Sequence, residues 1–313
     1  MNKIKQNKIT FSLILLAITV TFSSLTILSL PVLFNYESKV VKIEKNFYKN
    51  FKLYLKSSGN ISYKPFPKPH LLVEKASINF SNSKKNDDFI NTSNLKIFIS
   101  LRDIYLRTFD SFLSSEISKT NLYFEFSDII KIRKHLYQKI NKPVIFNDCK
   151  IFVNNNQNEI ILISPVKNIS YKINSKARTK NFDINGEIFG LNFKSKWKRN
   201  YNKPKQSFHS MNFYNPNIQI SNIFEYKENE KMNAITEIIF AQDKIEYEIN
   251  FNKNIIEIIS PNKKYTNFNI NSKIQLNPFY FNGVIAIKNK KVEDIIDYFL
   301  SNLIFYDKKY LGN

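Results

Sequence analysis

The sequence predicts a mainly β protein, in which an N-terminal transmembrane helix precedes an antiparallel β-sheet with a few short capping helices. Residues 9–36 carry no charge, and this stretch is long enough for one membrane crossing. Much of the remaining chain alternates apolar and polar residues with a period of two, which is typical of strands. The composition is 43% hydrophobic and includes 28 Phe and 17 Tyr, so a folded body with a sizeable core is expected.

Residues 1–36 are expected to form a short cytoplasmic tip and a transmembrane anchor. At 1.5 Å per residue the apolar stretch can cross a hydrocarbon layer of ~30 Å. Lys3, Lys5 and Lys8 precede it, and positively charged flanks stay cytoplasmic, which places the rest of the chain across the membrane. A cleaved signal peptide is the alternative. The length of the apolar region and the lack of a small-x-small cleavage site before Pro31 favour the anchor.

Residues 37–56 are expected to form a helical cap. Apolar residues recur there at spacings of three and four, and lysines occupy much of the remaining surface. The apolar positions are Val40, Ile43, Phe47, Phe51 and Tyr54. Such a helix can lie on a membrane or cap a sheet. Capping is favoured because the helix leads directly into the turn signal at residues 57–59.

Three prolines, Pro65, Pro67 and Pro69, follow within a short stretch. Proline fixes φ and pushes the preceding residue toward extended conformations, which excludes a helix and a central strand. The stretch is therefore expected to be a rigid, extended lead-in to a half-buried strand over residues 72–80. Two roles remain open: holding the chain extended where it leaves the cap, or protecting an edge strand from pairing with another chain.

Four later segments alternate most clearly, at residues 121–126, 191–198, 245–252 and 267–276. In each segment the apolar residues share one face, as in antiparallel strands that are wet on the other side. The apolar positions are Leu122, Phe124, Phe126, Leu191, Phe193, Trp197, Ile245, Tyr247, Ile249, Phe251, Phe268, Ile270, Ile274 and Leu276.

Three further helices are expected, at residues 101–112, at 128–140 and near the C-terminus at about 291–306. Asp128 is the expected N-cap of the second. No low-complexity linker divides the chain after the anchor, so residues 37–313 are expected to form one β domain.

No catalytic or metal-binding motif is found, and an enzyme, a metal or a cofactor is not expected. The three histidines lie far apart in the sequence, and the single cysteine, Cys149, is expected to be a core residue. The net charge of +21 is compatible with an anionic partner or with the residue bias of an AT-rich genome. Nucleic acid is not expected as a partner, because the basic residues are overwhelmingly Lys and the body is predicted to be translocated.

The order of features over residues 9–130 resembles the AsmA family of bacterial envelope proteins. The membrane helix is followed by "SSGN", "YKPFPKPHLLVEKASI", "SNLKIFISLRDI" and "EISKTNLYFEF". In that family a proline-containing stretch precedes a strand of the "L-x-L-x-x-a-x-I" kind, and a short helix precedes a strand of the "eI-x-x-x-x-L" kind. The matching positions are Pro67, Leu71, Leu72, Ala76 and Ile78 for the first pattern, and Leu101, Ile104, Glu116, Ile117 and Leu122 for the second.

This resemblance implies a chorein-like cap followed by a strongly curved, groove-like or taco-like sheet whose concave face is hydrophobic. It also implies a single-pass protein of the inner membrane with its bulk in the periplasm. The partners implied are phospholipid, the inner membrane and other envelope proteins, and the implied role is outer-membrane assembly or lipid transport.

The candidate groove lining is apolar and comes from the alternating segments. Its members are Phe124, Phe193, Trp197, Ile245, Tyr247, Ile249, Phe268, Ile270 and Ile274. Each of these residues can also be explained as the core of a closed sandwich. In that case the protein would be a membrane-tethered interaction scaffold that holds no lipid.

Overall fold

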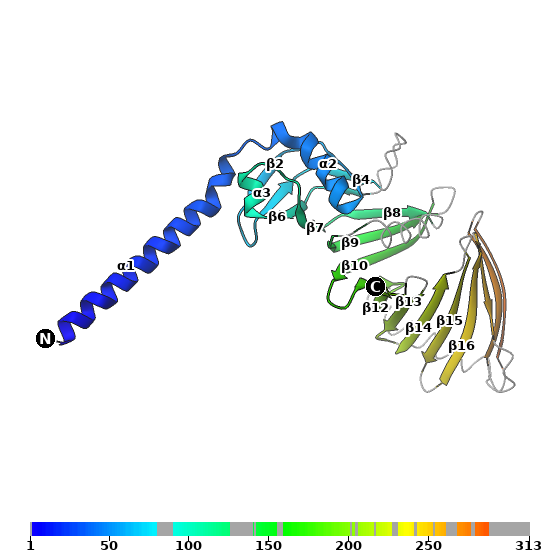
Figure 1. Cartoon of the computed structure of the whole chain (residues 1–313). Helices are drawn as coiled ribbons and strands as arrows, with labels where there is room; N and C mark the ends of the chain where they lie inside the picture. Colours follow the sequence, from blue (N-terminus) through cyan, green and yellow to red (C-terminus); the bar gives the residue numbers. More distant parts are fainter. Residues whose placement is uncertain are drawn as a thin grey trace, which may run out of the picture.

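The computed structural model shows an N-terminal helix, a few short helices and one large, open, mainly antiparallel sheet, as predicted (Figure 1). It describes the backbone of residues 2–79, 90–125, 140, 142–154, 159–200, 202–203, 206–215, 217–226, 231–240, 243–252, 254–260, 268–276 and 279–287. Side chains are described for the same residues except 2–10, 231, 240, 243, 268–269, 276, 279 and 285–287.

The described helices are α1 (Asn2–Ser29), η1 (Leu30–Leu33), η2 (Glu37–Lys39), α2 (Val40–Phe51) and α3 (Leu101–Tyr105). The first eight strands are β1 (Tyr54–Ser57), β2 (Ile61–Lys64), β3 (His70–Val73), β4 (Ala76–Asn79), β5 (Ile90–Thr92), β6 (Leu95–Ile99), β7 (Phe112–Ser118) and β8 (Asn121–Glu125). They are followed by β9 (Val144–Asn154), β10 (Ile160–Asn174), β11 (Thr179–Ile188), β12 (Leu191–Asn200), β13 (Gln206–Phe213), β14 (Ile218–Tyr226), β15 (Lys231–Phe240), β16 (Asp243–Asn252), β17 (Ile255–Ile259), β18 (Phe268–Leu276) and β19 (Phe279–Ile287).

The first helix projects away from the body (Figure 1). Together with η1 it supplies, within the described ranges, the one segment long and apolar enough to cross a membrane, the 23 residues Phe11–Leu33. Four of its hydroxyl side chains are satisfied within the helix, because each donates to the carbonyl four residues earlier; these are Thr19, Thr21, Ser24 and Thr26. Polar side chains of this kind can therefore be accommodated in hydrocarbon.

The predicted amphipathic helix is confirmed as α2, which buries Ile43, Phe47 and Phe51 against the sheet. It ends earlier than the predicted boundary at residue 56. Lys52 takes a left-handed conformation, with φ of 56°, and its amide donates to the Tyr48 carbonyl. The chain then enters β1, a strand that the sequence reading did not predict before the turn.

The three prolines lie in the loop between β2 and β3, which pair with each other. They are outside helix and strand, as predicted. The predicted lead-in into a first strand is nevertheless wrong, because β2 precedes the loop and the prolines connect two strands of a hairpin. β3 also pairs with β6, so the strand after the prolines is not an edge strand.

The single strand predicted over residues 72–80 is also wrong. The chain bends at Glu74 and Lys75, which are exposed, and this bend separates β3 from β4. Leu71 and Val73 are buried before the bend, whereas Ala76 and Ile78 are buried after it. The bend shifts the phase of the alternation by one residue, which a strict period of two does not anticipate.

The helix predicted over residues 101–112 is correct only in its first turn. Ser100 caps α3 by accepting a hydrogen bond from the Asp103 amide. Arg107 and Phe109 then adopt left-handed conformations, with φ of 53° and 52°, and these break the helix. Phe112, which had been placed at the end of this helix, begins β7.

Two branches of the sheet meet at β9, as the pairings show. One branch runs through β7, β6, β3 and β2, and the other through β8, β5, β4 and β1. β9 pairs in parallel with both β7 and β8, and every other pairing between described strands is antiparallel. The largest core cluster draws on α2 and both branches, so these elements form the cap of the molecule.

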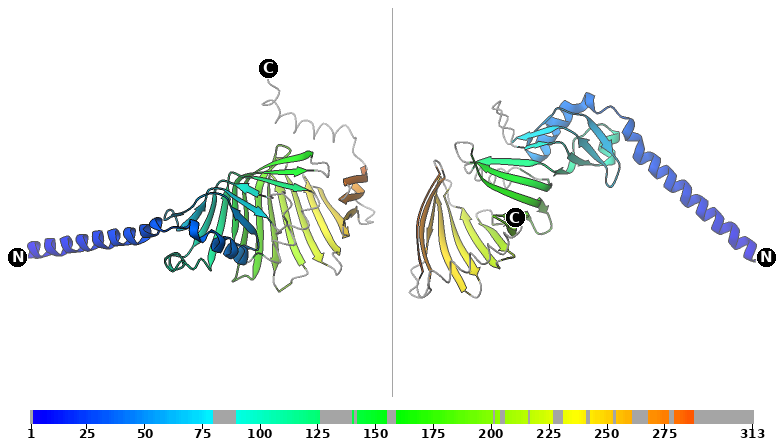
Figure 2. Two further views of the ribbon diagram at one scale, coloured as in Figure 1. Left: turned by 90° about the horizontal axis from the view of Figure 1, so that it is seen from above. Right: turned by 180° about the vertical axis from the view of Figure 1, so that it is seen from behind.

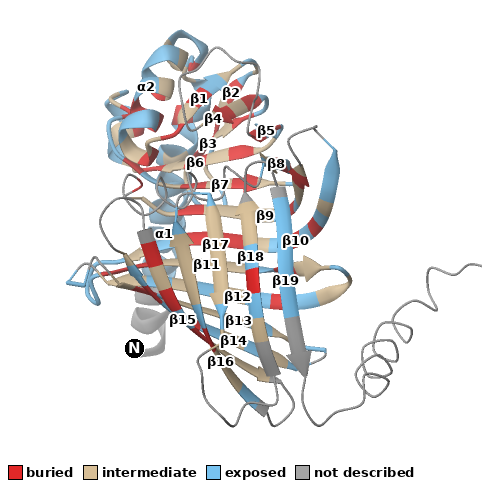
Figure 3. Cartoon of the chain, turned by 90° about the vertical axis from the view of Figure 1, so that its right-hand side faces the viewer, coloured by how far each residue is buried: buried red, intermediate tan, exposed pale blue. Residues whose placement is uncertain are grey.

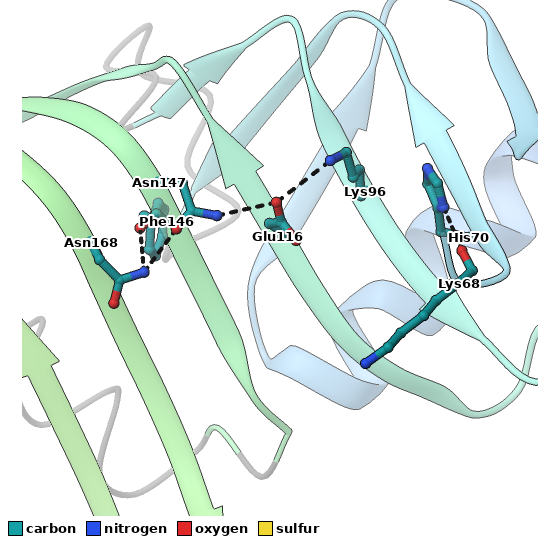
Figure 4. Close-up of polar contacts among 7 residues, drawn as sticks. All are labelled: Lys68, His70, Lys96, Glu116, Phe146, Asn147 and Asn168. Carbon is teal, nitrogen blue, oxygen red and sulfur yellow. Dashed lines mark hydrogen bonds and ion pairs between the residues drawn. The ribbon is translucent and has the colours of Figure 1, made fainter. Parts of the chain in front are cut away.

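A chain of polar contacts ties the cap to the larger part of the sheet (Figure 4). Lys96 on β6 forms an ion pair with Glu116 on β7, at 3.5 Å. The Asn147 amide donates to Glu116 at 3.1 Å, and the Asn168 amide donates to the Asn147 side-chain oxygen at 2.7 Å. Nearby in β9, Cys149 is buried as expected, and burial raises the pKa of its thiol.

From β9 to β19 each strand pairs antiparallel with the next along the chain, and the resulting sheet is curved (Figure 2). The strands predicted at residues 121–126, 191–198, 245–252 and 267–276 correspond to β8, β12, β16 and β18. The helix predicted at 128–140 has only residue 140 within the described residues, and the helix predicted at 291–306 lies outside them.

Candidate functional site

The backbone register places one set of side chains on the same face of the sheet. Directly opposite one another, from β11 to β16, are Phe182, Trp197, His209, Asn222, Thr236 and Tyr247. Since side chains alternate along a strand, residues two positions away share this face. We call this surface, which continues from β8 to β18, the apolar face.

The predicted lining residues with described side chains all lie on the apolar face. Phe124 on β8 reaches it through its register with Val153 on β9. The others follow from the pairings of β12, β16 and β18; they are Phe193, Trp197, Ile245, Tyr247, Ile249, Ile270 and Ile274. Phe268 is in β18, but its side chain lies outside the described part. Pro65, Pro67 and Pro69 are not in this site, because their loop belongs to the cap.

The two faces of the sheet differ strongly in exposure, and Figure 3 shows buried, intermediate and exposed residues along the same strands. On β15, Thr236 on the apolar face is 3% exposed, whereas its neighbour Ile235 on the opposite face is 60% exposed. All described strands belong to one sheet, and the part of the apolar face from β12 to β18 lies outside the core cluster that includes the cap. Side chains crowd together on the concave side of a curved sheet and spread on the convex side. The contrast therefore indicates that the apolar face is the concave one.

Aromatic side chains meet across this face. The rings of Trp197 on β12 and Phe224 on β14 stack at 4.8 Å with an interplanar angle of 12°. Phe224 also lies 6.0 Å from Phe251 on β16. Neighbouring strands are ~4.8 Å apart, so rings on strands separated by another strand can meet only by converging. Small residues on the intervening strands, Ser207 and Ala234, leave them room.

A chain of hydrogen bonds crosses the apolar face beside these rings, and sequence reasoning missed it. Ser195 Oγ lies 2.9 Å from His209 Nε2, and His209 Nδ1 lies 2.8 Å from the Asn222 amide nitrogen. The Thr236 hydroxyl donates to Asn222 Oδ1 at 2.5 Å. The signal was present in the sequence, since these polar residues fall on the apolar side of their strands.

The direction of these hydrogen bonds defines the chemistry of the group. The Thr236 hydroxyl donates to the side-chain oxygen of Asn222, so the N–H₂ end of that side chain faces His209 Nδ1 and donates to it. His209 is then protonated on Nε2 and donates to Ser195 Oγ. Burial lowers the pKa of His209 to about 4, which keeps the imidazole neutral at pH 7. In this arrangement no imidazole lone pair faces the Ser195 hydroxyl, so the pair is not set up for nucleophilic catalysis.

Comparison with known proteins found no relative. The chain matches no protein-family model, and no curated protein or solved structure matches it. Within the described ranges, no group of three or more His, Cys, Asp or Glu side chains is placed to hold a metal ion. The candidate site is the apolar face, where the aromatic cluster and the chain of hydrogen bonds lie together.

Proposed function

We propose that this chain is a membrane-anchored, non-enzymatic protein of the AsmA type, which binds or conveys phospholipid along the apolar face and supports outer-membrane assembly. One observation carries the proposal. From β12 to β18 the apolar face, rich in aromatic and aliphatic side chains, lies outside the core cluster of the cap and has no second layer of described residues to cover it.

Lipid acyl chains suit such a face. Each methylene group moved from water onto it contributes ~0.8 kcal/mol. From β12 to β18 the face extends about 30 Å across the strands, at the usual strand spacing of ~4.8 Å. A surface of this extent can accommodate several chains lying along it, whereas a small-molecule site is a compact cavity.

The proposed setting is the inner membrane. The segment Phe11–Leu33 serves as the anchor, and Lys3, Lys5 and Lys8 keep the N-terminus cytoplasmic. The cap and the sheet then lie in the periplasm. The apolar face receives phospholipid there, and other envelope proteins are the expected partners for passing it on.

Lipid extraction from a soluble fragment tests the proposal. Residues 35–313, which retain the buried Tyr36 but not the anchor, are purified without detergent and analysed by native mass spectrometry. We expect bound phospholipid, and we expect Phe193→Lys and Tyr247→Lys each to reduce it at least tenfold, because a charged side chain on this face disfavours acyl chains. The matched control Ile235→Lys, on the opposite face, should retain the lipid.

The opposite result favours the other function expected from the sequence. A folded, lipid-free fragment, with the far-ultraviolet circular dichroism of a β protein, would indicate an interaction scaffold. Circular dichroism of the Lys variants separates loss of lipid from loss of fold.

A further inference from the structure

The cap touches the membrane-spanning segment at a carbonyl that needs a donor. Pro31 has no amide hydrogen, so it cannot bond the Ile27 carbonyl four residues earlier as another residue in a helix would. The Tyr105 hydroxyl, at the end of α3, donates to this carbonyl instead. An unpaired carbonyl is strongly disfavoured in hydrocarbon, so a donor at this point suits a helix end that lies in the membrane.

This contact fixes the height of the cap along the helix. Ile27 lies six residues before Leu33, where the apolar segment ends. At 1.5 Å per residue this is about 9 Å inside the end of the segment. The Tyr105 ring also meets Phe34 edge-on at 6.1 Å, and the Arg107 guanidinium lies 4.5 Å from the centre of the Phe34 ring. α3 and the turn that follows it therefore pack against the end of the anchor.

Apolar side chains are exposed at the same end of the cap. Leu106, directly after Tyr105, is 60% exposed, and Phe66 in the proline loop is 58% exposed. The proline loop and α3 are neighbours, because the Ile99 amide donates to the Pro69 carbonyl just before α3 begins. We call the exposed residues at this end the foot; they are Val32, Leu33, Phe66, Tyr105 and Leu106.

Four exposed cations lie close in the sequence to residues of the foot; Lys64 and Lys68 flank Phe66, and Arg102 and Arg107 flank Tyr105 and Leu106. The acidic residue of α3, Asp103, is already engaged, since the hydroxyls of Ser100 and Thr108 donate to its carboxylate at 2.6 and 2.9 Å. Apolar residues accompanied by Lys and Arg are typical of surfaces that enter the head-group layer of a bilayer, where anionic lipids attract each cation.

We propose that the foot enters the anionic head-group layer of the bilayer that Phe11–Leu33 spans, so that the cap stands on the membrane in a fixed orientation. The proposal rests on the membrane anchorage in the proposed function but not on lipid binding by the apolar face. It also gives the proline loop a role, because Pro65 and Pro67 flank Phe66 and stiffen the loop that presents it.

Spin-label accessibility in lipid nanodiscs of phosphatidylethanolamine and phosphatidylglycerol tests the foot on the full chain. A Cys149→Ala background carries one label at a time, at Phe66→Cys or Leu106→Cys. Val20→Cys is the lipid-exposed reference, and Ile235→Cys is the water-exposed reference on the sheet. We expect the labels at 66 and 106 to be relaxed more by oxygen than by a water-soluble nickel complex, as at 20.

Three results would overturn the proposal or part of it. If the nickel complex relaxes the labels at 66 and 106 more than oxygen does, while oxygen dominates at 20, the foot does not enter the membrane. That result would leave lipid binding by the apolar face untouched. If the nickel complex relaxes the label at 20 more than oxygen does, both the membrane anchor and the membrane contact of the foot are refuted. In nanodiscs of phosphatidylcholine alone we expect the label at 66 to lie less deep in the bilayer than in the anionic nanodiscs. An equal depth in both would refute the preference for anionic head groups.

Discussion

Changing Phe47 to Ala is expected to lower the free energy of unfolding of the cap by about 3–5 kcal/mol, the usual range for a large buried aromatic side chain. Phe47 is fully buried on the inward face of α2, and its ring lies 4.7 Å from that of Phe51. Native-state hydrogen exchange of the amides in β1 and β4 measures the loss, because β1 packs against α2 through the stacked rings of Tyr54 and Tyr48 and pairs with β4.

Val41→Ala is the matched control, since Val41 is on the same helix but is 79% exposed. Its effect should stay within about 0.5 kcal/mol. Equal, small effects at both positions would contradict the account of α2 as a cap and would favour the alternative in which this helix lies on the membrane.

Acidification is expected to destabilise the sheet around His209 by about 3 kcal/mol. The folded-state pKa is about 4, below the ordinary value of 6.5, because burial disfavours the imidazolium. Between these values the unfolded chain binds more protons than the folded chain. The stabilisation is therefore complete above about pH 6.5 and is lost as the pH falls toward 4.

The single Trp of the chain reports this transition directly, because Trp197 lies 5.0 Å from the His209 ring. Urea unfolding followed by its fluorescence at pH 7, 6, 5 and 4 gives the slope of stability with pH. In His209→Gln the slope over this window should largely disappear, whatever the absolute stability of the variant. A slope that persists unchanged would mean that another group is responsible.

The sequence was most informative where a periodic pattern continues without interruption. The alternation of Tyr247 with its charged neighbours identified a strand and the correct face, and hairpin pairing then brought that face together with those of other strands. The sequence also predicted α2 and its buried face, since Ile43, Phe47 and Phe51 are spaced for one face of a helix. These features depend on local periodicity, which is present in the sequence itself.

Sequence reasoning failed where a few residues interrupt the period. The bend at Glu74 and Lys75 changes which residues face inward, and the left-handed Arg107 and Phe109 end α3 after one turn. Neither position is a glycine, so no composition signal marked these breaks. The parallel pairing of β9 and the contact of Tyr105 with the anchor depend on tertiary structure, which periodicity does not encode.

The polar chain on the apolar face was missed for another reason. His209, Asn222 and Thr236 lie on three different strands, so their alignment depends on the register of each hairpin. Within its own strand, each of these three residues is a single polar residue on the apolar side. Their hydrogen bonds satisfy one another and leave the surrounding aromatic surface as the part of the face suited to lipid.

Photo-crosslinking on the full chain in phospholipid bilayers tests the central claim most directly. Benzoylphenylalanine replaces Tyr247 on the apolar face or, as the matched control, Ile235 on the opposite face of the adjacent strand. After irradiation, mass spectrometry of the tryptic peptides shows whether a phospholipid is attached. We predict a phospholipid adduct at 247 and none at 235. Equal labelling at both positions, or no adduct at 247 in a chain that has kept its fold, would contradict lipid binding by the apolar face.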